Sequence, residues 1–446
     1  MFQGIRRPFL FLLFLVVFFP SKAQKYNGNS PYSEFGLGDI NPQGTLRNIG
    51  MAGVGVSLSS YEYINNINPA LLPANKYMNF DSAAKNYTML DAAGVFTMTK
   101  IQNNNNIGVN GSVYEAYLNL ALPVSSKWVT NIGLQPYSLI DYQVASAKQK
   151  VANTDTNTVV YSYSGTGGLY KVFVSNGIDL TKNLSAGLEV GYLFGDGSHN
   201  STSQIPIDFK YQLTNNYSSV YNGMSLKPGL AYRGKLNKSQ KYIDSTVFFN
   251  IGVTAEIIPV LRVIDSDNFQ RYDSLNNLLE SYDVDHQVAF LKVPTTYRAG
   301  FSIDKPGKWN IGVDVNYTNW GNYKGLDSVN YAKLNAAYGI AIGGEYYMNA
   351  QEELRKKVIR AGFSYNKTPL TLYNTVINDY SFTLGTTVPL GKIEAADRKR
   401  PLSKVNAAFV FGNKGTTEMN LVKEFYFKIY LGFIINDRWF GRNKIE

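Results

Sequence analysis

Hydrophobic and polar residues alternate with a period of two along much of this chain. Between residues 421 and 435 most odd positions are apolar, as at Phe425, and the even positions include Glu424 and Lys428. Residues 113–124 alternate in the same way. Alternating segments of about ten residues are typical of transmembrane β-strands, whose two faces meet lipid and lumen. A strand of a soluble β-sandwich also alternates, so the pattern alone leaves both folds open.

The connections between these segments distinguish the two folds. Short turns that carry lysine, such as Ser125–Lys127 and Lys305–Lys308, alternate with long polar connections, such as residues 197–220 and 259–289. Outer-membrane barrels have this asymmetry of short periplasmic turns and long external loops. We therefore expect an all-β fold, a 14-stranded antiparallel transmembrane outer-membrane β-barrel. The expected strands are residues 77–90, 113–124, 128–144, 159–180, 184–196, 221–233, 241–258, 290–304, 309–320, 335–348, 357–366, 378–390, 404–412 and 421–436.

A long segment precedes the first expected strand. It is rich in glycine, asparagine and serine, but its apolar residues, such as Met51 and Val54, are spaced too regularly for a linker. A fourteen-stranded barrel has a lumen wide enough to need filling. We interpret residues 24–76 as an N-terminal plug, or hatch, and residues 77–446 as the barrel.

The extreme N-terminus has the pattern of a secretory signal peptide. Arg6 and Arg7 precede the apolar run Phe9–Phe19, and residues 21–23 (Ser-Lys-Ala) form a cleavage site of small residues. The run is too short for a membrane-spanning helix, which needs about 20 residues. We predict that residues 1–23 are removed and that the chain resides in the outer membrane of a Gram-negative cell; a retained membrane anchor is the alternative.

Composition narrows the possible chemistry. The chain has no cysteine, which excludes disulfides, thiolate metal sites and a cysteine nucleophile. Its formal net charge is +10. The lysines lie mainly in short turns, and no block combines basic residues with an aromatic stacking platform, so we expect no nucleic-acid partner.

Four stretches resemble the FadL-type family of outer-membrane transporters, which carry long-chain fatty acids and other hydrophobic compounds. Residues 50–72 look like the family's glycine-rich hatch with its Asn-Pro-Ala motif, here Asn68-Pro69-Ala70. Residues 293–320 are similar to its Pro-x-x-x-Arg-x-Gly hairpin, and residues 359–370 to the segment that follows. Residues 413–440 look like the FadL-like barrels of Bacteroidetes, a branch that includes the shuttle barrel of the type IX secretion system. Because the family includes barrels that transport hydrophobic compounds and a barrel that handles proteins, the resemblance implies the architecture but not the transported molecule.

Parity along the strands points several charged residues into the barrel. Arg298 and Asp314 are each eight residues from Pro306, which predicts that they face each other across a hairpin. Two further pairs point inward by the same parity: Glu345 with Arg360, and Lys171 with Glu189. Two interpretations stay open: these charges bind the wall to the plug, or Arg298 or Arg360 binds an anionic head group.

No catalytic constellation is recognisable. The only histidines, His199 and His286, fall in expected external loops, without serine or carboxylate at a motif spacing. The glycine-rich residues 165–169 have no following helix to form a phosphate site, and the aspartate-rich residues 265–273 fit a solvated loop better than a Ca²⁺ site. We expect that the protein is not an enzyme, that it has no catalytic residues, and that it binds neither a cofactor nor a metal.

Pro136 lies inside an expected strand. Proline has no N–H for the ladder and is confined to edges and bulges, whereas a closed barrel has no edge. We therefore expect ladder bonds to both neighbouring strands to be missing near residues 135–137. The third strand of FadL-type barrels is kinked inward and opens the wall, so the resemblance implies a lateral gate at Gln135, Pro136 and Tyr137. An ordinary bulge is the alternative.

Together these features predict an outer-membrane channel for passive uptake of hydrophobic small molecules, similar to long-chain fatty acids, with lateral release through the wall. The alternative is a non-transport accessory barrel that binds secreted or envelope proteins, as the type IX shuttle does. The expected partners are membrane lipids and a hydrophobic ligand, or, in the alternative, those proteins. A continuous apolar pocket favours transport, and a polar, tightly filled lumen favours the accessory role.

Cleavage after Ala23 should make Gln24 the first residue of the mature chain, because the small residues directly follow the apolar run. N-terminal sequencing of outer-membrane material tests this. Recovery of the run Phe9–Phe19 in that material would contradict the prediction.

Overall fold

The structure, a computed structural model, describes most of the chain from residue 29 onward. The described residues are 29–60, 62–74, 87–125, 127–145, 149–150, 158–204, 211–237, 246–323, 332–349, 356–390 and 403–438. The expected signal peptide lies outside them, so its removal stays a prediction.

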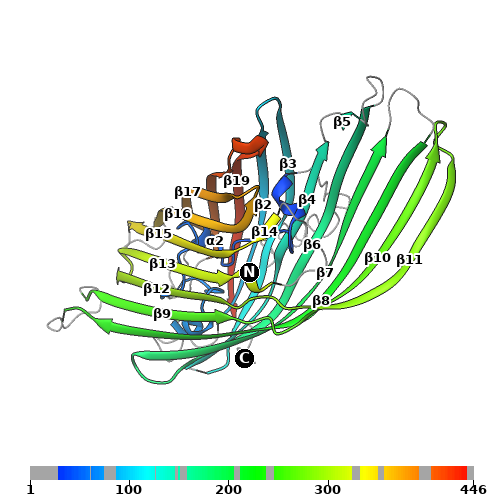
Figure 1. The fold of residues 1–446 in the computed structure, drawn as a ribbon. Helices are drawn as coiled ribbons and strands as arrows, with labels where there is room; N and C mark the ends of the chain where they lie inside the picture. Colours follow the sequence, from blue (N-terminus) through cyan, green and yellow to red (C-terminus); the bar gives the residue numbers. More distant parts are fainter. Residues whose placement is uncertain are drawn as a thin grey trace, which may run out of the picture.

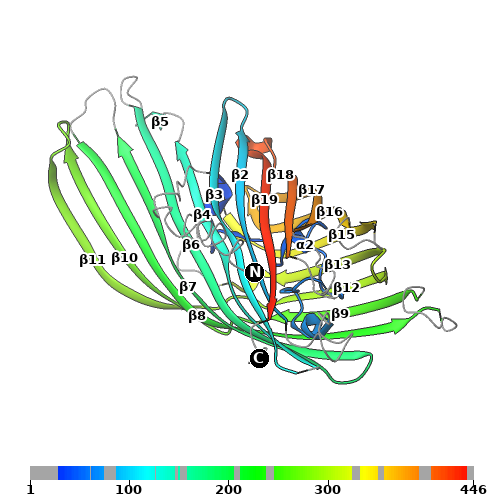
Figure 2. The ribbon, with the colours of Figure 1, turned by 180° about the vertical axis from the view of Figure 1, so that it is seen from behind.

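Within the described residues, fourteen antiparallel strands form a closed barrel (Figures 1 and 2). The last strand pairs with the first, from Lys423 opposite Gln102 to Arg438 opposite Tyr87. The wall consists, in order, of β2 (Tyr87–Gln102), β3 (Ile107–Pro123), β4 (Trp128–Ala145), β6 (Thr158–Asp179), β7 (Leu184–Gln204), β8 (Tyr211–Lys235), β9 (Phe248–Glu256) with β10 (Leu261–Asp273), β11 (Leu278–Leu291) with β12 (Thr296–Lys305), β13 (Trp309–Asn319), β15 (Ala336–Met348), β16 (Lys357–Leu372), β17 (Thr375–Leu390), β18 (Ser403–Gly415) and β19 (Lys423–Arg438). The short strands β5 (Gln149–Lys150) and β14 (Ala332–Leu334) pair with β6 and β16.

The expected number of strands is confirmed, but several expected boundaries are wrong. The first wall strand begins at Tyr87, and residues 91–112, expected as a loop, belong mainly to β2 and β3. Residues 259–289, also expected as a loop, form mainly the β10–β11 hairpin. At the outer ends of β10 and β11, exposed apolar residues such as Phe269 and Leu278 stand among polar ones without regular alternation, so the period-two signal that identifies a strand is lost there.

The wall is interrupted along its seventh and eighth strands. β8 pairs with β10 as far as Gly223 and with β9 from Gly229 onward. Among the described residues, one isolated bridge joins β8 to the connecting segment in between. Pro259 and Pro294 lie in the two connecting segments and lack the N–H that a continuous ladder needs. Beyond the interruption β10 and β11 rise with β6–β8, away from β12 and β13 (Figure 1).

Residues 29–60 and 62–74 form the N-terminal segment, which lies inside the ring of strands (Figures 1 and 2). Its regular elements are short: η2 (Pro31–Glu34), β1 (Asp39–Ile40), α2 (Leu46–Ile49) and η3 (Pro69–Ala74). Met51, Val54 and Leu58 are fully buried and form one apolar cluster. No helix in the described part of the chain is long and apolar enough to cross a membrane.

The strand order predicts which connections face the outside of the cell. A cysteine at Asn276, in the exposed β10–β11 turn, or at Ser201, near the end of β7, should react with an impermeant maleimide in intact cells. A cysteine at Asn237, after β8 at the opposite end of the barrel, should react only after the cells are opened. The chain has no cysteine of its own to interfere. Reversed labelling would overturn the topology.

Candidate functional site between the N-terminal segment and the barrel wall

Glycines on the inner wall let the backbone of the N-terminal segment approach the strands directly. A Cβ at Gly362 would lie 2.5 Å from the carbonyl carbon of Met51, and one at Gly343 would lie 2.4 Å from the Met51 oxygen. Side chains larger than glycine would therefore displace the segment. Such backbone contacts come from five strands, at Gly177, Gly187, Gly252, Gly343 and Gly362, and a Cβ at Gly229 would meet the Asn68 side chain.

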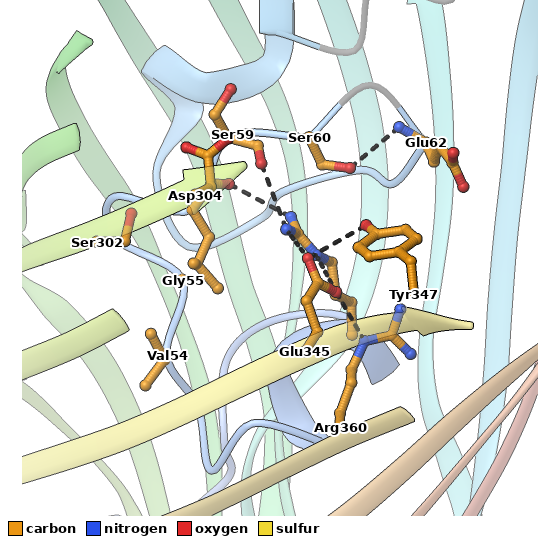
Figure 3. A network of polar contacts seen from close by, with 12 residues as sticks. Val54, Gly55, Ser59, Ser60, Glu62, Ser302, Asp304, Glu345, Tyr347 and Arg360 are labelled. Carbon is orange, nitrogen blue, oxygen red and sulfur yellow. Dashed lines mark hydrogen bonds and ion pairs between the residues drawn. The ribbon is translucent and has the colours of Figure 1, made fainter. Parts of the chain in front are cut away.

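A buried charge cluster attaches the same segment to β15 and β16 (Figure 3). Glu345 accepts from Arg47 of α2 at 2.6 Å and from Arg360 at 3.1 Å, and all three side chains are at most 2% exposed. Glu345 and Arg360 are directly opposite each other in the ladder, so both point inward as predicted. Removing one member of such a cluster leaves an unpaired buried charge, which costs about 3–5 kcal/mol.

Asp314 of β13 also holds the segment. Its Oδ2 accepts hydrogen bonds from the backbone N–H groups of Gly55 at 2.6 Å and Val56 at 2.8 Å. The residue opposite is Gly300, where a Cβ would lie 2.2 Å from the other carboxylate oxygen of Asp314. The carboxylate thus occupies space that any side chain at position 300 would fill.

The expected opposition of Arg298 and Asp314 is wrong. The β12–β13 hairpin is centred on Gly307, not on Pro306, so Arg298 lies opposite Asn316. Gly307 has a φ of +69°, and this left-handed position of the turn sets the register. Arg298 has no hydrogen-bond or ion-pair partner among the residues that the structure describes, and it lines a cavity.

The Asn-Pro-Ala motif packs against β6, β7 and β8. Asn68 Nδ2 donates to the Leu230 carbonyl at 3.1 Å, and Asn68 Oδ1 accepts from the Ala70 N–H at 3.0 Å. A Cβ at Gly187 would lie 2.3 Å from the carbonyl carbon of Pro69. The motif is therefore a contact between the N-terminal segment and the wall.

A second buried charge cluster joins β6, β7, β8 and β9. Lys171 Nζ lies 3.0 Å from Glu189 and 2.8 Å from Glu256. Lys227 Nζ lies 2.9 Å from Glu189 and donates to the carbonyl of Asn66 in the N-terminal segment at 2.7 Å. Lys171 and Glu189 point inward as predicted, and their cluster reaches the segment through Lys227.

The ladder between β4 and β6 continues past Pro136. Pro136 is opposite Tyr170, Ser138 is opposite Leu169, and Tyr137 is the extra residue of a bulge between them. The expected loss of ladder bonds on this side is therefore wrong, because one additional residue accommodates the proline.

The other edge of β4 loses its barrel partner. β3 and β4 pair only as far as Leu118 opposite Leu134. Beyond this point β1 pairs with β4, with Ile40 opposite Ser138, while β3 continues to pair with β2. A strand of the N-terminal segment thus takes the place of a wall strand.

Residues 29–43, which we call the N-terminal arm, contact both strands at this interruption. Asn29 Nδ2 donates to Ser112 of β3 at 2.7 Å and to Asp141 of β4 at 2.6 Å. On the far wall, Lys414 of β18 forms an ion pair with Asp39 of the arm. The arm also contacts β4 through its backbone, since the Ser30 N–H donates to the Asp141 carbonyl at 3.0 Å.

The predicted gate residues lie beneath the arm. Gln135 Nε2 donates to the side-chain oxygen of Gln43, and the Tyr137 carbonyl accepts from the Asn41 N–H at 3.0 Å. Gln135, Pro136 and Tyr137 are all buried. The bulge and the arm therefore meet at one point of the wall.

A cavity of about 470 Å³ lies between the N-terminal segment and the wall. Tyr114 of β3 and Tyr137 of β4 line it on the two sides of the interruption. Arg298, Lys428 and Glu424 also line it. The cavity is thus amphipathic and extends to the place where β3 and β4 separate.

Sequence reasoning missed the side chains that the N-terminal segment contributes. Arg47 is the single arginine between residues 29 and 74, and it binds the inward carboxylate of Glu345. Glu62 forms ion pairs with Lys356 and Lys404. Isolated charges in a polar segment expected to fill a lumen are a usable signal, but their partners depend on three-dimensional placement.

The fold is similar to that of solved FadL-type outer-membrane barrels. A Pseudomonas aeruginosa FadL homologue aligns with a TM-score of 0.56 at 12% identity, over 90% of this chain and 99% of that one. The P. putida toluene transporter TodX aligns with a TM-score of 0.54 at 14% identity, over 91% and 100%. The CymD monoaromatic hydrocarbon channel aligns with a TM-score of 0.53 at 12% identity, over 91% and 99%. At these identities the likeness concerns the fold.

The family model BamG matches residues 5–446, so this chain belongs to the BamG family. No curated protein matches the chain.

Replacing Gly362 by alanine should loosen the N-terminal segment, because the new Cβ meets the Met51 backbone. We expect a loss of about 1–3 kcal/mol, as for other overpacked sites, seen as a lower midpoint of thermal unfolding in detergent and faster proteolysis of the segment. Gly108→Ala in β3 is the matched control, since nothing lies within 4 Å of the added Cβ. Equal behaviour of the two variants would contradict the close packing.

Proposed function

We propose that this chain is an outer-membrane channel through which hydrophobic compounds pass from the external side into the membrane. The observation that carries the proposal is the cavity between the N-terminal segment and the wall, which extends to the interruption between β3 and β4. The FadL homologue, the toluene transporter TodX and the hydrocarbon channel CymD have the same fold, and their names describe hydrophobic cargo or relatives of such transporters.

In this proposal the N-terminal segment is a plug, and its two parts have different roles. Residues 44–74 are held by wall glycines and buried charges, so they close the barrel axis. The arm covers the interruption between β3 and β4, where β1 pairs with β4. Displacement of β1 from β4 opens a lateral path, so an apolar compound leaves the cavity sideways without crossing the periplasm.

Arg298 supports a preference for compounds that carry an anionic group. It lines the cavity and has no hydrogen-bond or ion-pair partner among the described residues. A guanidinium group binds a carboxylate through two parallel hydrogen bonds, an arrangement that favours planar anions. A long-chain fatty acid combines such a group with an apolar tail that suits the membrane.

A disulfide between β1 and β4 tests lateral release. Ile40 and Ser138 are cross-strand partners, so Ile40→Cys with Ser138→Cys should form a disulfide under oxidising conditions. We expect the oxidised variant to lose most uptake of a fluorescently labelled dodecanoic acid by intact cells, and reduction to restore it.

Val313→Cys with Ile342→Cys is the matched control, because these residues are partners in the continuous β13–β15 ladder. Oxidation of this pair should leave uptake unchanged. Normal uptake by the oxidised Ile40–Ser138 variant would refute release through the arm.

A second candidate function is that of an accessory barrel that binds secreted or envelope proteins. The tight and polar filling of the interior favours it, since buried ion pairs and backbone contacts hold residues 44–74 against wall strands on several sides. The resemblance of residues 413–440 to Bacteroidetes barrels, a branch that includes the type IX shuttle, points the same way. Mass spectrometry of the lipids and proteins that co-purify in mild detergent separates the two functions.

A further inference from the structure

In the part of the chain that the structure describes, the outer half of the eighth wall strand has an edge without a ladder partner. Among the described residues, the β11 ladder is formed with β10 alone, and Figure 1 shows β11 at the outer margin of the sheet. In an antiparallel pair, alternate residues direct their N–H and C=O groups away from the partner strand. Alternate residues of β11 therefore present backbone donors and acceptors on this edge that no residue in the described ranges pairs with.

The two ends of this edge differ in chemistry. Near the barrel, Val288 continues the outward apolar row of Val220 and Ile264, and Phe290 is 68% exposed. Exposed apolar side chains on the outside of a barrel mark the lipid-facing band, where unpaired backbone groups cost several kcal/mol each. The lower part of the edge therefore favours a paired state.

Toward its tip the hairpin is acidic. Residues 261–291 contain two arginines against six carboxylates, a net charge of −4 on a chain whose formal charge is +10. Arg271 is already paired with Glu280 at 2.7 Å. Asp283 lies on β11 itself and is exposed, as is Tyr282, at 69%.

We propose that the free edge of β11 binds an extended segment of a second polypeptide by strand addition. The bound strand is basic where it passes Asp283 and apolar where it passes Phe290. Only a strand satisfies the row of backbone donors and acceptors along the edge. The acidic tip then selects among strands, because opposite charges across a ladder stabilise the pair and like charges weaken it.

The same charges disfavour pairing between two copies of this chain. In an antiparallel self-pair centred near Tyr282, Glu280 and Asp283 of each copy come within about two positions of the same carboxylates in the other. Acidic residues on an edge deter unselective pairing in natural sheets. The proposal is independent of transport, and it gives the accessory function a surface and a partner chemistry.

Binding of synthetic strand peptides to the full chain in detergent tests the proposal. One peptide of about twelve residues alternates lysine and threonine in one half and valine and isoleucine in the other. Its control has glutamate in place of lysine, and a second control has proline at alternate positions. We expect the lysine peptide to bind at least about tenfold more tightly than either control and to slow amide hydrogen exchange within residues 278–291.

Asp283→Lys should lower the affinity for the lysine peptide about tenfold. The variant should then bind the glutamate peptide more tightly than the lysine peptide. Glu418→Lys, an exposed reversal in the β18–β19 turn, is the matched control and should change neither. Uptake of the labelled dodecanoic acid should be normal in both variants, so failure of this proposal is distinguishable from failure of the uptake proposal.

Three outcomes would overturn the proposal. They are equal binding of the lysine and glutamate peptides, unchanged exchange in β11 on peptide binding, and a stable dimer of the chain with β11 amides protected in the absence of peptide.

Discussion

A strand in the membrane cannot leave its backbone N–H and C=O groups unpaired, because hydrocarbon offers no substitute for a hydrogen bond. A closed barrel meets this constraint by pairing every strand on both sides, and the barrel described here departs from continuous pairing at several places, two of which carry the proposals. Between β3 and β4, part of the freed edge of β4 is covered from within the chain, by β1. At β11 no described residue continues the ladder. The first departure concerns the inside of the barrel and the second its external surface, and both proposals follow from this difference.

The interior depends on a complementary constraint, the mutual fit of backbone and charge. Gly300 and Asp314 illustrate it, since the carboxylate that holds Gly55 and Val56 fills the volume left by the missing side chain at position 300. Burying a polar group costs free energy unless it has a hydrogen-bond or ion-pair partner. Here the charged wall residues and the polar groups of the N-terminal segment serve as partners for each other. This mutual satisfaction extends over residues 44–74 and along the arm, where Ser30 donates to Glu424 and Asp39 pairs with Lys414.

The strand count followed from the sequence because alternation and loop asymmetry survive wherever one face meets lipid. The strand boundaries were wrong at the outer ends of β7, β8, β10 and β11, where apolar and polar residues no longer alternate regularly. The inward direction of Glu345 and Arg360 was also predictable, since parity alone determines it. Their third partner, Arg47, was not, because parity says nothing about a segment without regular structure. The register error at Arg298 came from placing the turn at Pro306 when the left-handed residue is Gly307.

Several prolines lie where pairing between wall strands is interrupted. A proline within a barrel strand requires one ladder bond to be missing, whatever its surroundings. Pro228 lies in the stretch of β8 where the partner changes from β10 to β9, and Pro369 lies at a register shift between β16 and β17. With Pro136, Pro259 and Pro294, these residues mark the interruptions of the wall. Pro389 lies in the β17–β18 ladder without a register shift, so a proline marks where a barrel ladder can break, but not whether it breaks, on which side, or what covers the opening. At Pro136 the side toward β6 is repaired by a bulge, and the nearby loss of β3 is compensated by the arm. That compensation depends on a segment about a hundred residues earlier in the chain, and only the folded arrangement brings the two together.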